Sequence, residues 1–363
     1  MKVSKRTRSN LLNALIIVCT LGLVLYLSAR GGDIGDAWNT LKSADIRWIG
    51  AAVGSWVVFM MFEAMGLHVF FHQQGVRIKY RTSFLVALIG SFYSSVTPAA
   101  TGGQPMQVYY LHQRYIPTGV ATSALVVRFF SFQLMLSVIG TVLWIGYGPF
   151  VAEHLGVNRW ILIMGYVYNV VSVSAVVMLS LWRTPVRKLA RLIVRLGYRL
   201  RLTKHPEETE RKWLGAVETF HESIAIITRR PLNLLVQLII GCLQLLCYMS
   251  ILWCIYRGLG LNTYKWGHLV TLHTMEYISA AYAPLPGASG AQEGVFSLYF
   301  GRVFEGSTRL AAMLLWRFFT YYFSLVFGAV VMVLHGLRSG KSLKESMQMT
   351  SADQEPPVDR REA

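Results

Sequence analysis

Apolar segments of membrane-spanning length alternate with short basic segments along the chain. They occupy residues 11–28, 48–71, 121–146, 160–182, 232–256 and 310–335. Each is close to the roughly 20 residues that an α-helix needs to cross the hydrocarbon core of a bilayer. The pattern predicts an all-α polytopic membrane protein with six full spans.

Two further apolar arms, 83–97 and 267–282, are too short to cross. An arm of about 15 residues reaches only about 22 Å as a helix. The first arm runs into S-V-T-P-A-A-T-G-G-Q-P at 95–105, and the second into P-L-P-G-A-S-G-A-Q-E at 284–293. Proline and glycine stop a helix, and backbone freed at membrane depth must be buried in protein or line a wet cavity. We therefore predict two re-entrant helical hairpins, which return along 106–116 and 294–304.

Composition supports this prediction, and charge adds an orientation. The chain is 54% hydrophobic and 15% charged, with a mean hydropathy of +0.43 and a net charge of +17. The basic residues stand in blocks beside the apolar runs, where they set topology and meet anionic lipid, so we expect no nucleic-acid partner. These blocks predict cytoplasmic N- and C-termini, and the mixed charges and prolines of 336–363 predict a disordered cytoplasmic tail.

The longest polar region, 183–230, holds twelve Lys or Arg residues against five Glu residues. It opens with V-R-K-L-A-R-L-I-V-R-L-G-Y-R-L, which alternates basic and apolar residues at helical spacing. Such a helix is expected to lie on the anionic inner leaflet. A solvated connecting helix fits the same pattern, so both interpretations are open.

The two breaks form part of a repeat. Three residues of the first recur in the second at one constant offset along the sequence, as Pro98 and Pro286, Gly102 and Gly290, and Gln104 and Gln292. Downstream, R-F-F-S-F from Arg128 recurs as R-F-F-T-Y from Arg317 at nearly the same offset. Counting spans from the cytoplasmic N-terminus makes 121–146 run outward and 310–335 run inward, so the two copies have opposite orientations in the membrane. We predict a first repeat at 1–148 and a second, inverted repeat at 149–335 with 183–230 as an insertion, an architecture typical of transporters whose broken helices meet near the midplane.

Charged residues inside the membrane mark the candidate site. Each intramembrane arginine costs at least about 2.5–3.5 kcal/mol on insertion scales, so each is expected to face the bundle interior or water. The arginines would receive a lipid phosphate or hold the hairpins, or alternatively form packed ion pairs with Glu63 or Glu276. Glu293 would cap the return helix, or it would contact the cargo or carry a proton. The predicted substrate-binding set is Pro98, Gly102, Gly103, Gln104, Pro105, Arg128, Pro286, Gly287, Gly290, Gln292, Glu293 and Arg317.

Catalytic chemistry is not indicated. The sequence has no nucleophile–base–orienter set, no phosphate-binding P-loop and no dinucleotide fingerprint. His68 and His72 stand one turn apart near Glu63, but no third ligand has a fixed spacing. We therefore expect no catalytic residue, no cofactor and no metal.

The motifs T-P-A-A-T-G-G-Q-P, P-L-P-G-A-S-G-A-Q-E and W-R-F-F-T-Y-Y resemble those of the flippase-like transmembrane-region family of lysyl-phosphatidylglycerol synthase. The family includes the membrane half of the multiple peptide resistance factor. The resemblance implies lipid translocation in a bacterial cytoplasmic membrane and a role in resistance to cationic peptides. Many members carry charges where this chain has Gln104, Gln107 and Val127, and the glutamine form resembles stand-alone members from Gram-positive bacteria.

Two-domain relatives make lysyl-phosphatidylglycerol with a soluble domain after the membrane part. This chain ends about 25 residues after its last span, so we expect no intrinsic phosphatidylglycerol lysyltransferase activity. The leading hypothesis is a lipid translocase for an anionic or aminoacylated phospholipid or a lipid-linked sugar. The alternatives are a non-transporting scaffold that presents lipid to a lipid-synthase partner through 183–230, and a lysyltransferase as the family name suggests.

Overall fold

The computed structural model describes residues 34–199, 206–280 and 286–339. These residues fold into helices joined by short loops, and no β-strand occurs among them. The predicted first span, 11–28, and most of the predicted tail, 336–363, lie outside the described residues. The all-α prediction is confirmed for the part of the chain that the structure describes.

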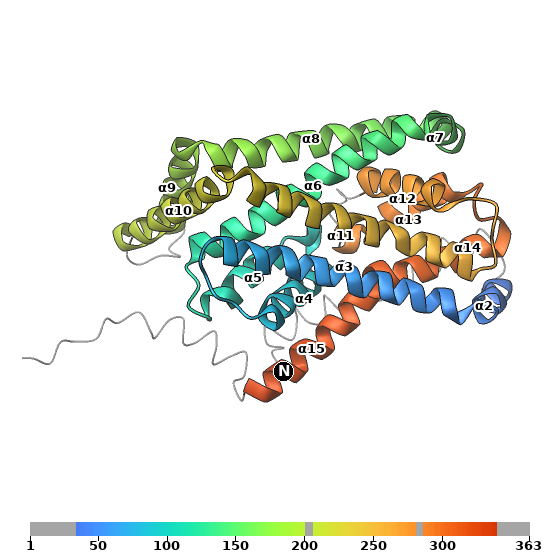
Figure 1. The fold of residues 1–363 in the computed structure, drawn as a ribbon, viewed down its shortest axis with the longest axis horizontal. Coiled ribbons are helices and arrows are strands. Elements are labelled where there is room, and N and C mark those ends of the chain that lie inside the picture. The colour runs from blue at the N-terminus through green and yellow to red at the C-terminus, as the bar shows by residue number, and fades with distance from the viewer. Residues whose placement is uncertain (1–33, 200–205, 281–285, 340–363) are drawn as a thin grey trace, which may run out of the picture.

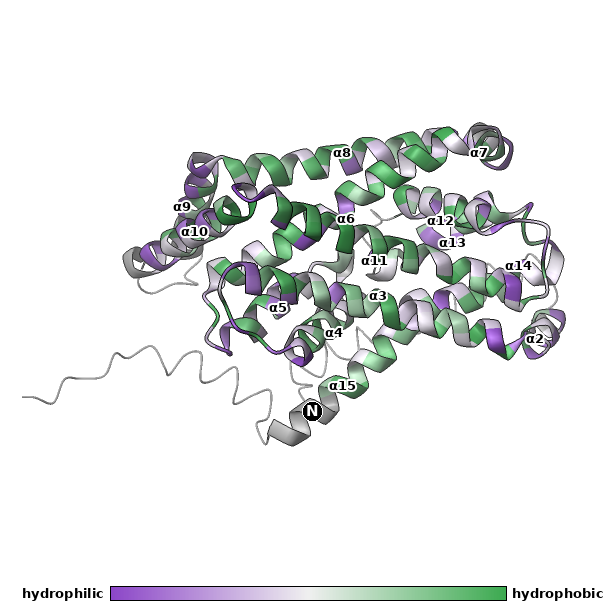
Figure 2. Ribbon diagram, viewed as in Figure 1, coloured by the Kyte–Doolittle hydropathy of each residue, from purple (hydrophilic) through white to green (hydrophobic). Residues whose placement is uncertain are grey.

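Five helical segments are long and apolar enough to cross a membrane. They are α3 (Ile46–Gln73), α6 (Thr118–Gly146), α8 (Arg159–Leu181), α11 (Pro231–Gly258), and the segment formed by α14 (Gly306–Arg317), a π-helical turn (Phe318–Tyr322) and α15 (Phe323–Ser339). Their bounds follow the predicted apolar runs to within a few residues. Figure 2 shows hydrophobic residues along α6 and α8 and hydrophilic ones gathered at α9.

Helix α11 lies at the centre of the bundle, where it packs against α3, α6, α12 and α14. It runs antiparallel to α3: the Asp45 amide donates to the Gly258 carbonyl at 2.8 Å at one end, and the Gln73 side chain donates to the Asn233 carbonyl at 3.3 Å at the other. The C-terminal ends of α3 and α11 therefore lie at opposite ends of the bundle. This fixes where the next segments begin.

Each of these two helices leads into a broken helix pair (Figure 1). After α3 come α4 (Tyr80–Val96), a 3-10 turn η1 (Pro98–Ala100) and α5 (Gly103–His112). After α11 come α12 (Trp266–Ala280), a 3-10 turn η3 (Pro286–Ala288) and α13 (Ala291–Phe300). The pairs start from opposite ends of the bundle, and η1 and η3 contact one another between them.

The backbone has the same unusual conformation at both turns. Ala99 and Ala100 have φ of 50° and 54°, and their counterparts in the second break, Gly287 and Ala288, have φ of 61° and 49°. This left-handed region is costly for residues with a Cβ and persists only when the surroundings impose it. The order of span, broken pair and span is also the same in both halves. The inverted repeat itself stays a prediction.

The remaining helices flank this bundle. Helices α2 (Ile34–Lys42) and α7 (Gly148–Leu155) are short and lie at one end, and hydropathy alone did not reveal them. At the other end, α9 (Arg183–Arg199) and α10 (Pro206–Thr228) pack against each other, and α10 also packs on α6. The predicted amphipathic helix at the start of 183–230 corresponds to α9.

Candidate functional site: a cavity between two broken helices

The two breaks face one cavity of about 720 Å³. Gln104 and Pro105 line it from the first broken pair, and Gly287, Ala288 and Gln292 line it from the second. Polar side chains of α4 and α11 complete its wall, among them Ser91, Ser94, Ser95 and Gln244. The irregular backbone of both breaks thus borders a cavity that has polar side chains in its wall, as expected for backbone that leaves a helix within a bilayer.

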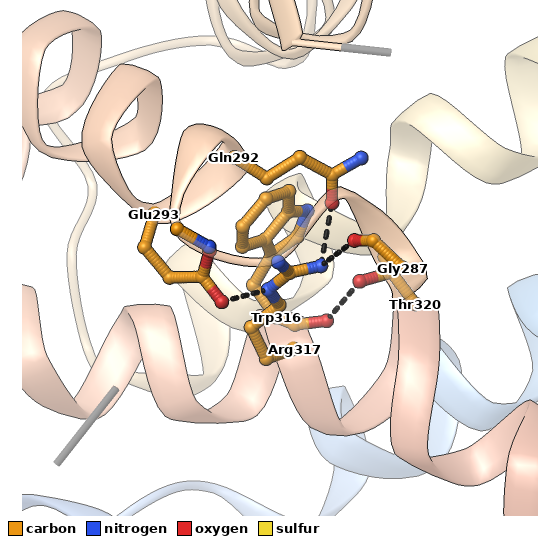
Figure 3. Close-up of polar contacts among 7 residues, drawn as sticks. Gly287, Gln292, Glu293, Trp316, Arg317 and Thr320 are labelled. Carbon is orange, nitrogen blue, oxygen red and sulfur yellow. Dashed lines mark hydrogen bonds and ion pairs between the residues drawn. The ribbon is translucent and has the colours of Figure 1, made fainter. Parts of the chain in front are cut away.

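Arg317, at the end of α14, is held firmly by the second break (Figure 3). Its Nε donates to Glu293 Oε1 at 2.6 Å, and its Nη1 donates to Gln292 Oε1 at 2.5 Å and to the Gly287 carbonyl at 3.1 Å. The guanidinium also lies 5.3 Å from the Trp316 ring centre. Only 3% of the Arg317 side chain is exposed. Charge-assisted bonds in such a dry setting fix both the arginine and the break.

Glu293 connects this arginine to the start of α13. Its second carboxylate oxygen accepts a hydrogen bond from the Gly290 amide at 2.7 Å, which caps the helix. The sequence left capping and a functional role as alternatives, and the structure shows that the cap also holds Arg317. The predicted alternative partner, Glu276, does not pair with Arg317. Its carboxylate is fully buried on α12 and has no hydrogen-bond partner among the described residues.

Arg128, on α6, is held more loosely. Its Nη1 forms an ion pair with Glu63 on α3, and Gln244 donates to the same Glu63 oxygen at 2.6 Å. The Arg128 side chain is 17% exposed and lines the cavity, and its buried Nε has no partner among the described residues. Arg317 also keeps one unused nitrogen, Nη2, but its other two nitrogens are bonded to the second break. No residue of the first break holds Arg128 in that way within the described part of the chain.

The difference between the two arginines follows from one position in the repeat. The offset that relates the two breaks places Pro105 opposite Glu293, and proline has no carboxylate. The first break consequently offers its arginine no acidic partner, and Arg128 reaches across to Glu63 on a neighbouring helix. The two halves match in backbone but not in charge.

Small residues allow the arms of the first pair to approach closely. A Cβ built on Gly103 would lie 2.7 Å from the Gly90 carbonyl and would overlap Ser94 Oγ. Gln107, which is buried, fills the space over Gly90 and donates to the Val86 carbonyl at 3.0 Å. The neutral Gln107 thus has a structural role that its sequence position did not reveal.

Tyr321 joins the two breaks directly. It lies in the π-helical turn after Arg317, and its ring rests against Gly287, where a side chain would overlap it. Its hydroxyl donates to the Ser95 carbonyl at 3.1 Å. Sequence reasoning missed this residue because a π-turn displaces side chains relative to the regular helix that an Arg-aromatic motif implies.

The predicted site residues fall into three groups. Those that line the cavity are Gln104, Pro105, Arg128, Gly287, Gln292 and Arg317, together with Glu63. Those that shape the breaks without lining it are Gly102, Gly103, Gly290 and Glu293, where, for example, the Gly102 amide donates to Thr97 Oγ1 at 2.9 Å. Pro98 and Pro286 begin the 3-10 turns of the two breaks. Glu276 lies apart from both groups.

Two sequence comparisons place the chain among known proteins. It is 23% identical over 322 residues to a UPF0104 membrane protein of Archaeoglobus fulgidus, a match that covers 85% of this chain and 93% of that protein. The family model described as the lysylphosphatidylglycerol synthase TM region matches residues 10–328, which include both breaks and both intramembrane arginines. The chain therefore belongs to the lysylphosphatidylglycerol synthase transmembrane-region family.

Proposed function

We propose that this protein moves an anionic or aminoacylated phospholipid, or a lipid-linked sugar, between the two leaflets of the cytoplasmic membrane. The observation that carries the proposal is the shared cavity, which is bordered by breaks that enter from opposite ends of the bundle and is faced by the loosely held Arg128. Secondary transporters with discontinuous helices bind cargo at such a junction.

Arg128 is the natural contact for the phosphate of the headgroup, because it lines the cavity and is the more exposed of the two arginines. Arg317 is committed through two of its nitrogens to Glu293, Gln292 and Gly287, so its role is to hold the second break. The two arginines therefore have different tasks in the proposed mechanism.

The cavity also suits an amine. Glu63 lies beside Arg128, and the rings of Phe59, Tyr248 and Tyr277 line the same cavity. Carboxylates and aromatic faces both attract ammonium groups. A headgroup with both a phosphate and an amine would meet opposite charges side by side, which supports an aminoacylated phospholipid as a substrate class.

Reconstitution of the full chain into liposomes tests the proposal. Exposure of fluorescent phosphatidylglycerol at the outer leaflet should be faster than in protein-free liposomes. Arg128→Ala should slow it about ten- to hundredfold, because it removes a charge-assisted hydrogen bond of roughly 1.5–3 kcal/mol. Arg302→Ala, which alters an exposed ion pair with Glu153, serves as the matched control and should transport normally. No acceleration for any of several headgroups would overturn the proposal.

A further inference from the structure

A second cavity, of about 610 Å³, lies away from the two breaks, between α6, α8, α9 and α10. It is bordered by the first turns of α6, the last turns of α8, and one face of α10 from Lys212 to Phe220. Its volume falls within the roughly 300–1,000 Å³ of pockets that hold organic ligands. The transport proposed for the first cavity, which lies between the two breaks, does not depend on this second cavity.

The lining of this second cavity, called the groove below, is almost entirely apolar. Val126, Val176, Leu179 and Val217 contribute aliphatic side chains. Thr122 also lines it, and its hydroxyl donates to a carbonyl of its own helix at 2.8 Å. Among the described residues that line the groove, Lys212 is the one with a charged side chain.

The groove has a fixed shape on one side because α10 packs tightly on α6. A Cβ on Gly119 would lie 2.5 Å from the Ala216 carbonyl and 2.7 Å from Thr219 Cβ, so the two helices are in close contact there. Beside this contact, Trp213 lines the groove and is 45% exposed. The groove is therefore built between packed helices and opens toward the surface at Lys212 and Trp213.

The α9 side of the opening is cationic, whereas α10 carries five Glu residues against two Lys or Arg residues. Helix α9, which contributes Val186 to the groove, carries six Lys or Arg residues and no acidic residue. Arg183, one turn before Val186, and Lys188 are exposed and form no ion pair within the described part of the chain. Basic residues of this kind are found where a protein meets an anionic leaflet, and exposed tryptophans such as Trp182 and Trp213 favour the same interface.

We propose that this groove binds an anionic phospholipid of the cytoplasmic leaflet, with an acyl chain among the aliphatic side chains and the phosphate at Lys212 beside Trp213. The apolar lining, together with Lys212 at the opening and the basic helix α9 beside it, is complementary to one molecule that has both an acyl chain and a negative headgroup. The site is separate from the translocation cavity, and it anchors the α9–α10 hairpin to the membrane.

Quenching of Trp213 by brominated lipids tests this assignment in nanodiscs that contain the full chain. The signal of Trp213 is the difference between wild type and Trp213→Phe. We expect brominated phosphatidylglycerol to quench it at a mole fraction about five-fold lower than brominated phosphatidylcholine, the factor that one basic residue beside an anionic leaflet contributes.

Variants separate the two halves of the proposal. Lys212→Glu should abolish the preference for phosphatidylglycerol, whereas Ala216→Phe should fill the groove and remove quenching by both lipids. Gly215→Ala, whose Cβ meets nothing within 4 Å, is the control and should behave as wild type.

Equal quenching by the two lipids in the wild type would overturn the phosphate contact. An absence of quenching would overturn the acyl-chain site and indicate that protein covers the groove. Because the readout needs no transport, and because Arg128→Ala should leave it unchanged, failure here is distinguishable from failure of the proposed translocase.

Discussion

Removing Arg317 should destabilise the protein far more than removing Arg128. Arg317→Ala leaves the Glu293 carboxylate, which is 2% exposed, without its cation and also frees the Gln292 side chain and the Gly287 carbonyl. Loss of one partner from a buried ion pair typically costs about 3–5 kcal/mol. We expect Arg317→Ala to lower the free energy of unfolding by that amount.

Arg128→Ala should cost much less, about 1.5 kcal/mol, the lower end of the range for a hydrogen bond to a charged group. The reason is that Glu63 keeps the hydrogen bond from Gln244 at 2.6 Å and borders the cavity. Combining Glu293→Gln with Arg317→Ala should recover part of the loss, because the added change removes the stranded buried charge.

Reversible unfolding in mixed micelles, followed by tryptophan fluorescence, measures these differences through the linear dependence of the unfolding free energy on denaturant. The two single variants should differ by about 1.5–3.5 kcal/mol. Equal destabilisation by Arg317→Ala and Arg128→Ala would refute the division between a structural and a cargo-facing arginine.

Four further substitutions, one of them a control, have defined outcomes in the same unfolding assay. Gly103→Ala should destabilise the protein by about 1–3 kcal/mol, because the added Cβ would lie 2.7 Å from a backbone carbonyl. Gly54→Ala, whose Cβ meets nothing within 4 Å, is the control and should be neutral or stabilising. Equal effects would contradict the close packing of α4 on α5. Glu276→Gln should leave stability unchanged or raise it, since it removes a fully buried carboxyl group that has no hydrogen-bond partner among the described residues. A loss of unfolding free energy above about 2 kcal/mol would contradict this expectation. Tyr321→Phe should cost about 0.5–1.5 kcal/mol through loss of the bond to Ser95, and no loss would contradict that bridge.

The spans and breaks could be predicted from sequence because each rests on a local property. Long apolar runs identify spans, and clustered proline and glycine identify breaks wherever they fall in a membrane protein. The described helices follow these predictions closely, from α3 to α15. The short helices α2 and α7 escaped because they have neither the length nor the hydropathy of a span.

The pairing of charges could not be predicted in the same way. Glu276 and Glu293 both lie in the second broken pair, and the choice between them as the partner of Arg317 depends on the direction in which each helix faces. Spacing in the sequence gives that direction only along one regular helix, and the break interrupts it. Arg128 on α6 pairs with Glu63 on α3. The sequence identified Glu63 as a possible partner, but it did not show that the two side chains meet.

The difference between the two halves was nevertheless present in the sequence. Pro105 stands where the second break has Glu293, a departure that becomes visible only when the offset between the breaks is applied position by position. Its consequence, a bound Arg317 and a loosely held Arg128 at the cavity, needed the side-chain contacts. A matched motif thus identified the site, and the mismatch within it distinguished the roles.

The most direct test of the central claim, that cargo occupies the cavity between the breaks, is photocrosslinking of the full chain in liposomes. The probe is phosphatidylglycerol with a photoactivatable group on its headgroup, and peptide mass spectrometry locates the label. We predict label on residues 99–107 and 287–292 from both breaks, and its loss in Arg128→Ala. Label confined to the outward faces of α8, with both breaks unlabelled, would contradict the claim.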